Sequence, residues 1–223
     1  MPKVTKEYVE EKKKEIVDAA IRVCNSKPAY SVTMRDVLKE AGISIGRMYH
    51  YFSSIDEVFA EIINRTYGEM NFTADVDNIF ESGKQPNEII MDSLMLLGEL
   101  MDEVISRFGK LLFYLDVIYI NNPEIAKEMW GRFAVNEDAN ILVVKLITFI
   151  ETQIANGYFK TNLPREYLSF QLLTSIEGIR RIAIARHFNQ EVSTELGALK
   201  SDWANVKGMM KTSAEIIIRL LNS

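Results

Sequence analysis

The residues between Ser44 and His50 carry side chains that could bind the edges of DNA bases. Arg47 has a planar guanidinium group, which can donate two parallel hydrogen bonds to guanine. Ile45 could contact the methyl group of thymine, and Gly46 has no side chain to keep its helix away from DNA. Both Gly46 and His50 have plainer explanations: the glycine could simply weaken its helix by about 1 kcal/mol, and the histidine could bind phosphate or only water. Together these residues predict a segment that reads DNA.

Two short helices joined by a tight turn, between Thr33 and Phe52, are expected to position these side chains. Thr33 and Asp36 form the S/T-x-x-D/E pattern of a capping box at the start of the first helix. Gly42 can end this helix in a left-handed conformation without steric cost, and Ser44 can cap the second helix. The first helix has an apolar stripe of Met34, Val37, Leu38 and Ala41. This is the sequence form of a helix-turn-helix, whose second helix enters the major groove.

Nine residues of this stretch agree in order and spacing with the pattern of a known family: Thr33, Arg35, Asp36, Gly42, Ser44, Gly46, Tyr49, Tyr51 and Phe52. On these residues the chain resembles the N-terminal domain of TetR-like (tetracycline-repressor-like) transcriptional regulators. The match extends upstream through residues 14–20 and downstream into residues 56–59, and it covers roughly residues 1–65. One position departs from the pattern, because Ile55 stands where the family has a lysine that contacts phosphate.

The resemblance implies a dimeric DNA-binding transcriptional regulator, a repressor that a hydrophobic small molecule releases from its operator. An alternative has the same DNA-binding segment, but its body binds a protein partner instead. Because one short helix reads only a few base pairs, two of them about 34 Å apart are expected to read a palindromic operator in double-stranded DNA. Tyr49 matches a family tyrosine that hydrogen-bonds to phosphate. The residues expected to contact DNA are Lys14, Thr33, Arg35, Ser44, Ile45, Gly46, Arg47, Tyr49 and His50.

The distribution of charge agrees with this expectation. The chain has a net charge of −5, but residues 12–52 contain eight Lys and Arg against four Asp and Glu, which gives +4 there and −9 elsewhere. A basic segment on an acidic chain is typical of a nucleic-acid-binding module. Since an ordinary protein surface can also carry +4, the motif decides the interpretation and the charge only supports it.

The composition predicts a cytoplasmic protein without a membrane span. The longest apolar stretch, residues 111–120, is interrupted by Asp116 and is shorter than the ~18 residues that a membrane span needs. The charged N-terminal residues lack the apolar core of a secretory signal. The single cysteine, Cys24, excludes an intramolecular disulfide and lies on an apolar helical face. There we expect a buried, inert thiol and not a redox sensor.

Residue patterns for catalysis or metal binding do not occur in the sequence. His50 and His187 are its two histidines, and no His, Cys and Asp residues cluster at the spacing of metal ligands. Neither a Walker loop nor a G-x-S-x-G motif is present. We therefore expect no enzyme, no metal and no cofactor; a catalytic helical body is the second alternative, which a turnover screen would test.

The remaining pattern predicts an all-α protein of about nine or ten helices. Residues 1–65 are expected to form the DNA-binding domain, and residues 66–223 a helical regulatory and dimerisation domain. The expected helices beyond the helix-turn-helix are residues 7–25, 54–70, 89–107, 109–121, 123–133, 135–156, 164–188 and 203–221. Residues 73–86 contain Gly83 and Pro86 with few periodic apolar positions, and the domain border is placed within or before them.

The last two helices are expected to pair with those of a second copy, as the resemblance implies. They carry more apolar residues than one exposed face tolerates: Ile176, Ile179, Ile182, Ile216 and Ile217. Flexible and aromatic side chains in residues 89–180 suggest an apolar pocket for the small molecule. The candidate lining residues are Met95, Phe108, Phe113, Tyr114, Trp130, Phe149, Phe170 and Glu177. Plain core packing is the alternative for the apolar ones, and an ion pair with Arg180 or Arg181 is the alternative for Glu177.

Overall fold

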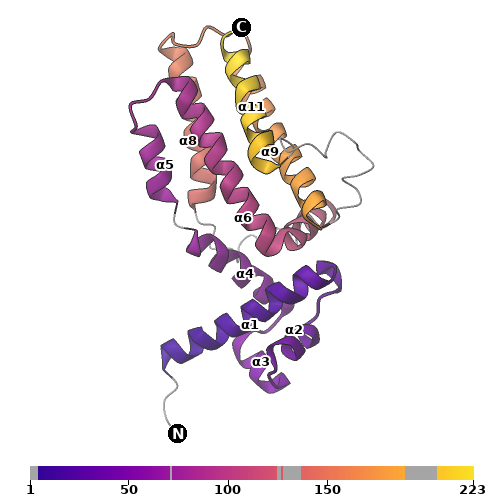
Figure 1. Ribbon diagram of the computed structural model, residues 1–223. Coiled ribbons are helices and arrows are strands. Elements are labelled where there is room, and N and C mark those ends of the chain that lie inside the picture. Colours follow the sequence, from indigo (N-terminus) through magenta and orange to yellow (C-terminus); the bar gives the residue numbers. More distant parts are fainter. Residues whose placement is uncertain (1–4, 71, 125–126, 128–136, 189–204) are drawn as a thin grey trace. The chain divides into compact units, whose positions relative to one another are not determined.

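The computed structural model describes residues 5–70, 72–124, 127, 137–188 and 205–223 (Figure 1). In these ranges the chain forms nine α-helices and no strand, which confirms the predicted all-α fold. The chain divides into two compact units. Unit 1 is Met1–Glu69 with Ser106–Val135, and unit 2 is Met70–Ile105 with Asn136–Ser223.

Unit 1 begins with four helices, which we call the head. They are α1 (Lys6–Ser26), α2 (Met34–Ala41), α3 (Ile45–Tyr51) and α4 (Ile55–Glu69), with a 3-10 helix at Ala29–Ser31 between α1 and α2. Helix α1 contacts the other three helices, and α2 contacts α3. It can do so because its buried residues are all apolar and recur at helical spacing: Ile16, Val17, Ala19, Ala20, Val23 and Cys24. Burial raises the pKa of the Cys24 thiol to about 12, as expected for an inert cysteine.

Helix α6 (Pro86–Asn121) is one long helix with a break at Phe108, whose φ of −151° and ψ of 30° are not helical. The sequence predicted two helices here, ending and beginning on either side of this residue, so the break lies where it was expected. Hydrogen bonds with Asn25, at the end of α1, stabilise the chain at this break. The side-chain amide of Asn25 donates to the Arg107 carbonyl at 3.0 Å, and Lys110 Nζ donates to the Asn25 carbonyl at 2.6 Å. Phe108 itself is fully buried.

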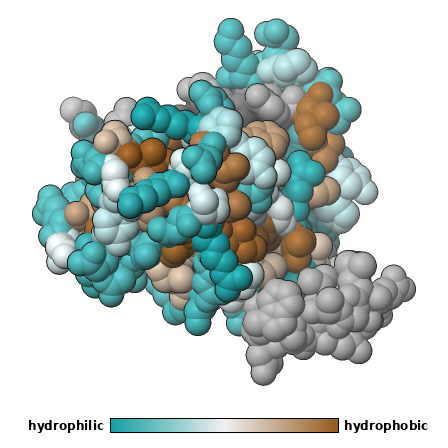
Figure 2. Space-filling view, turned by 90° about the horizontal axis from the view of Figure 1, so that it is seen from above, coloured by the Kyte–Doolittle hydropathy of each residue, from teal (hydrophilic) through white to brown (hydrophobic). Residues whose placement is uncertain are grey.

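Unit 2 contains α5 (Thr73–Phe80), the first part of α6, α8 (Glu137–Ala155), α9 (Arg165–Phe188) and α11 (Val206–Leu221). Helices α9 and α11 pack against each other. Helix α11 also approaches α6 closely, because a Cβ at Gly98 would lie 3.2 Å from Met210 Cγ. Lys145 joins α8 to α5 through Asp77 at 2.5 Å. The face of the molecule in Figure 2 has hydrophobic side chains scattered between hydrophilic ones.

Several predicted boundaries differ from the structure. Helix α5 lies in residues 73–80, where the sequence showed too little periodicity to predict a helix, and Val76 is its buried contact residue. The predicted helix at 123–133 and the loop at 189–202 lie almost wholly outside the described residues, as do the first residues of the predicted helix 203–221. In the part of the chain that the structure describes, no helix is long and apolar enough to cross a membrane. Nor do its His, Cys, Asp and Glu side chains form a group that could hold a metal ion.

Candidate nucleic-acid interface

The turn between α2 and α3 has the geometry that its sequence predicts. The Thr33 amide donates to Asp36 Oδ2 at 2.8 Å, and the Asp36 amide donates to Thr33 Oγ1 at 3.3 Å, so the capping box is complete. Gly42 ends α2 with a φ of 65°, in the left-handed region that glycine adopts without strain. Ser44 then caps α3 by accepting from the Arg47 amide at 3.4 Å. Local features therefore explain where α2 begins and ends and where α3 begins, and a helix-turn-helix results.

Asp36 also joins this motif to the connector that follows α1. Lys27 Nζ lies 2.7 Å from Asp36 Oδ2. The hydrogen bonds from Lys27 and then from Thr33 lower the pKa of Asp36 from 3.8 to about 2. The ionised form of Asp36 is therefore more stable in the folded head than in the unfolded chain. This difference stabilises the fold only while the group is ionised.

Asp36→Asn is expected to lower the free energy of unfolding at neutral pH by roughly 1 kcal/mol, a modest value because Asp36 is 36% exposed and solvent screens the pair. Because the folded pKa is depressed, the contribution is complete above the unfolded pKa of 3.8 and is lost as the pH falls towards about 2. Denaturant unfolding of both proteins across this range measures it. A difference of the same size at pH 7 and near pH 2 would contradict the assigned cause.

Helix α3 separates its side chains into two faces. Met48 is fully buried and Phe52, directly after the helix, is 4% exposed, so both belong to the head core. Ile45 is 56% exposed and Tyr49 is 54% exposed, so both lie on the opposite, solvent-facing side of α3. All nine residues expected to contact DNA are exposed: Lys14, Thr33, Arg35, Ser44, Ile45, Gly46, Arg47, Tyr49 and His50.

Gly46 lies on the exposed face of α3, and no contact inside the protein requires a glycine at this position. A Cβ built at this position would meet no atom within 4 Å. Its φ is not in the left-handed region either, since the glycines with positive φ are Gly42, Gly83 and Gly157. Glycine costs about 1 kcal/mol relative to alanine in an exposed helix. The absence of a side chain is thus unexplained by packing, and an external surface that comes close to the helix would explain it.

The guanidinium group of Arg47 is held by a residue that the sequence did not single out. Arg47 Nη2 lies 2.5 Å from the hydroxyl oxygen of Tyr8, near the start of α1. The two residues are 39 positions apart, and no local pattern links them. Only the packing of α1 beside α3 brings them together.

Basic side chains of α1 lie at the same end of the head as Tyr8. Lys12 is paired with Glu15 at 2.5 Å, and Lys13 lies 3.9 Å from Glu10. Lys14 is exposed, and no carboxylate among the described residues pairs with its ammonium group. Of the three lysines, Lys14 therefore has its charge most available to an external phosphate.

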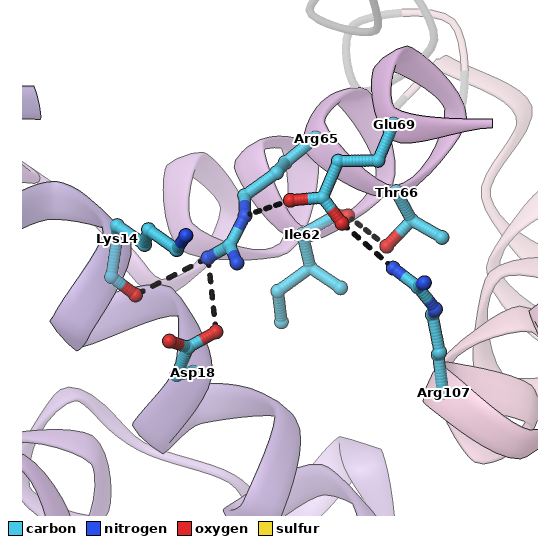
Figure 3. A network of polar contacts seen from close by, with 7 residues as sticks. All are labelled: Lys14, Asp18, Ile62, Arg65, Thr66, Glu69 and Arg107. Carbon is cyan, nitrogen blue, oxygen red and sulfur yellow. Dashed lines mark hydrogen bonds and ion pairs between the residues drawn. The ribbon is translucent and has the colours of Figure 1, made fainter. Parts of the chain in front are cut away.

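A network of ion pairs fixes α1 and α4 to the second part of α6 (Figure 3). Arg65 Nη1 lies 2.9 Å from Asp18 Oδ1 and donates to the Lys14 carbonyl at 3.3 Å, while its Nε donates to Glu69 at 2.8 Å. The other oxygen of Glu69 accepts from Arg107 at 2.8 Å. Hydrogen bonds from Arg65 and Arg107 lower the pKa of Glu69. The carboxylate thereby stays charged and bridges two helices within unit 1.

The residues predicted to line a ligand pocket are divided between the two units. In unit 1, Phe108 is buried, Phe113 is 51% exposed, and Tyr114 stacks edge-on against Phe59 with ring centroids 6.2 Å apart. In unit 2, Met95 is half-buried and Phe149 stacks against Phe80 at 5.6 Å. Phe170 is 68% exposed, Glu177 pairs with Arg180 at 2.6 Å, and Trp130 lies outside the described residues.

Unit 2 contains two hollows of very different size. A crevice between α8, α9 and α11 has a volume of about 10 Å³, barely enough for one water molecule. An open groove of about 420 Å³ lies along α5 and the first part of α6. Eight residues line the groove, and all but Ile79 and Leu96 are polar or charged: Asp75, Asn78, Ile79, Ser82, Lys84, Asp92, Leu96 and Glu99.

Comparison with known proteins agrees with the helix-turn-helix. Residues 16–62 match the family model of bacterial regulatory proteins, tetR family. The chain is 28% identical over 204 residues to the HTH-type transcriptional regulator YfiR of Bacillus subtilis, covering 90% of this chain and 92% of YfiR. It is 24% identical over 179 residues to the nucleoid occlusion factor SlmA of Haemophilus influenzae, covering 72% and 81%.

The fold is also that of solved members of this family. A TetR transcription regulator from Haloarcula marismortui superposes with a TM-score of 0.58 at 16% identity, over 96% of this chain and 97% of that one. The matched segment, residues 16–62, contains the capping box, the left-handed glycine and the exposed face of α3. The head therefore matches the tetR family of bacterial regulatory proteins, and the chain as a whole is a TetR-like DNA-binding transcriptional regulator.

Proposed function

We propose that this protein is a dimeric, cytoplasmic repressor that reads a palindromic operator with α3 and leaves it when a hydrophobic small molecule binds. In this proposal residues 1–65 are the DNA-binding domain and residues 66–223 the regulatory and dimerisation domain. The carrying observation is the separation of α3 into two faces. Met48 faces the core, while Ile45, Gly46 and Arg47 lie exposed on one short helix. The side chains that could contact bases are thus exposed on one face of a short helix, as in the recognition helix of a helix-turn-helix.

Side chains on α9 and α11 support the dimer. Phe170 and Leu173 on α9 are 68% and 46% exposed, and Ile182 and Ile216 are 39% and 46% exposed. Large apolar side chains that gather on two helices in contact favour burial against a second surface. In a closed dimer the same helices of both copies meet, so four helices would bury these residues together.

Base reading by Arg47 is tested by substitution. Arg47→Ala is expected to weaken binding to the preferred operator by about 1–3 kcal/mol and to relax discrimination at one base pair, because a bidentate contact to guanine is lost. Binding selection on genomic fragments followed by affinity measurements on single-base variants checks both effects. Lys14→Ala is the control, since a phosphate contact carries no sequence information and its loss weakens all sequences about equally. Unchanged operator preference in Arg47→Ala would exclude this role.

A second candidate function is supported by the likeness to SlmA. That relative is named a nucleoid occlusion factor and not a transcriptional regulator. A body that binds a protein partner would also need no apolar pocket, and the crevice of about 10 Å³ is too small for a ligand. The two candidates differ in a melting-temperature screen with hydrophobic small molecules. A ligand that binds the folded protein must raise the melting temperature, and for the leading proposal the same compound must also release DNA.

A further inference from the structure

The hydrogen bond between Arg47 and Tyr8 connects the exposed face of α3 to α1. Arg47 donates from Nη2 to the Tyr8 hydroxyl oxygen at 2.5 Å. A guanidinium group has five N–H donors in a fixed plane, and this contact uses one of them. The donors that remain are enough for a bidentate contact with guanine, so the bond to Tyr8 and a bond to DNA can exist together.

Tyr8 has a backbone contact, a ring contact and a place on a helix that packs in the head. Its amide donates to Thr5 Oγ1 at 3.3 Å, which makes Tyr8 part of the capped first turn of α1. The ammonium group of Lys12 lies 5.7 Å from the centre of its ring, and Lys12 is in turn paired with Glu15. Helix α1 is fixed by its buried face and by the bond from Arg65 to the Lys14 carbonyl. The ring is 39% exposed, and its hydroxyl oxygen is the acceptor that the first turns of α1 present to Arg47.

We propose that Tyr8 is a positioning residue for base reading: its hydroxyl holds the Arg47 guanidinium in the orientation that contacts the operator. The inference rests on the proposed base-reading role of Arg47. A free arginine side chain has many rotamers, and binding DNA would have to select one of them. An acceptor that has already selected the orientation lowers the entropy lost on binding. Tyr8 therefore increases affinity only for sequences with the base pair that Arg47 reads.

Other roles for the same bond would have different consequences. If Tyr8 withheld Arg47 from DNA, loss of the hydroxyl would tighten binding. If Tyr8 contacted phosphate instead, loss of the hydroxyl would weaken all sequences equally and lower the salt dependence of binding. If the bond only supported the fold, the melting temperature would fall and base discrimination would not change.

Tyr8→Phe separates these roles, because phenylalanine keeps the ring under Lys12 and removes only the oxygen. The expected result is a loss of operator affinity of about 2- to 10-fold, the range for one hydrogen bond. Discrimination at the base pair read by Arg47 should fall, while affinity for unrelated DNA, the salt dependence and the melting temperature stay the same. Tyr158→Phe is the matched control, since that tyrosine is 40% exposed and lies in unit 2. It should change none of these quantities.

The double variant Tyr8→Phe with Arg47→Ala completes the test. If Tyr8 acts through Arg47, this variant binds the operator no more weakly than Arg47→Ala alone. Tighter binding by Tyr8→Phe, a uniform loss over all sequences, or unchanged discrimination would each overturn the proposal. If base preference depends on Arg47 but survives Tyr8→Phe, only the role of Tyr8 is wrong. If it survives Arg47→Ala as well, the proposed base-reading role is wrong too.

Discussion

Phe170→Glu is expected to convert the proposed dimer into a monomer with an intact fold. Phe170 is 68% exposed on α9, so a carboxylate there is solvated in the monomer and costs little stability. In a symmetric interface each substitution occurs twice, and the two charges would be buried in an apolar surface. Interface residues of this kind contribute about 2 kcal/mol or more each. The dimer dissociation constant should therefore rise on the order of 1,000-fold, at about 1.4 kcal/mol per factor of ten.

Sedimentation velocity at micromolar concentration measures this change, and Val144→Glu provides the control. Val144 is also a large apolar side chain of unit 2, 59% exposed, but it lies on α8. Its substitution should leave the dimer intact. Operator affinity should fall together with the loss of the dimer, because a monomer contacts only one half-site. A Phe170→Glu protein that sediments as a dimer would show that α9 does not form the interface through this residue.

Gly46→Ala is expected to stabilise the protein and at the same time to weaken operator binding strongly. Alanine is about 1 kcal/mol more favourable than glycine in an exposed helix, and the new methyl group meets no protein atom within 4 Å. This should raise the melting temperature by about 2–4 °C for a chain of this size. Against DNA, the methyl group would push α3 away from the bases. The affinity loss should reach the order of 100-fold, about 3 kcal/mol, as several contacts weaken together.

Gly68→Ala is a close control for this substitution. Gly68 is also exposed in a helix of unit 1, α4, and a Cβ there would likewise meet no atom within 4 Å. It should give a similar rise in melting temperature and leave operator affinity unchanged. Equal effects of Gly46→Ala and Gly68→Ala on DNA binding would mean that close approach at Gly46 has no role.

The parts of this fold that the sequence predicts are those with local causes. The capping box of Thr33 and Asp36, the left-handed Gly42 and the Ser44 cap each depend on residues within four positions of one another. Local hydrogen bonds and backbone preferences decide such features, so a pattern in the sequence is enough to find them. The break in α6 lies between the two helices that the apolar periodicity predicts, residues 89–107 and 109–121.

The parts that the sequence does not predict depend on contacts between distant residues. Arg47 meets Tyr8, and Arg65 meets Asp18, only because the helices of the head pack at particular angles. Helix α5 was missed because eight residues with one buried side chain, Val76, give too weak a periodic signal. The ligand pocket stays a prediction, because it was made from the number of apolar and aromatic residues, and composition alone does not say which of them face a common space.

The composition of unit 1 has a consequence for building chimeric regulators. The head does not end as a compact body at Glu69, because residues 106–121 complete it. Asn25 supplies a donor for the Arg107 carbonyl where the α6 helix is broken, Glu69 accepts from Arg107, and Tyr114 stacks on Phe59. A graft that joins residues 1–69 to a foreign body would leave these groups without their partners. A transplantable DNA-reading cassette from this protein therefore consists of two separate stretches of chain, which must be exchanged together.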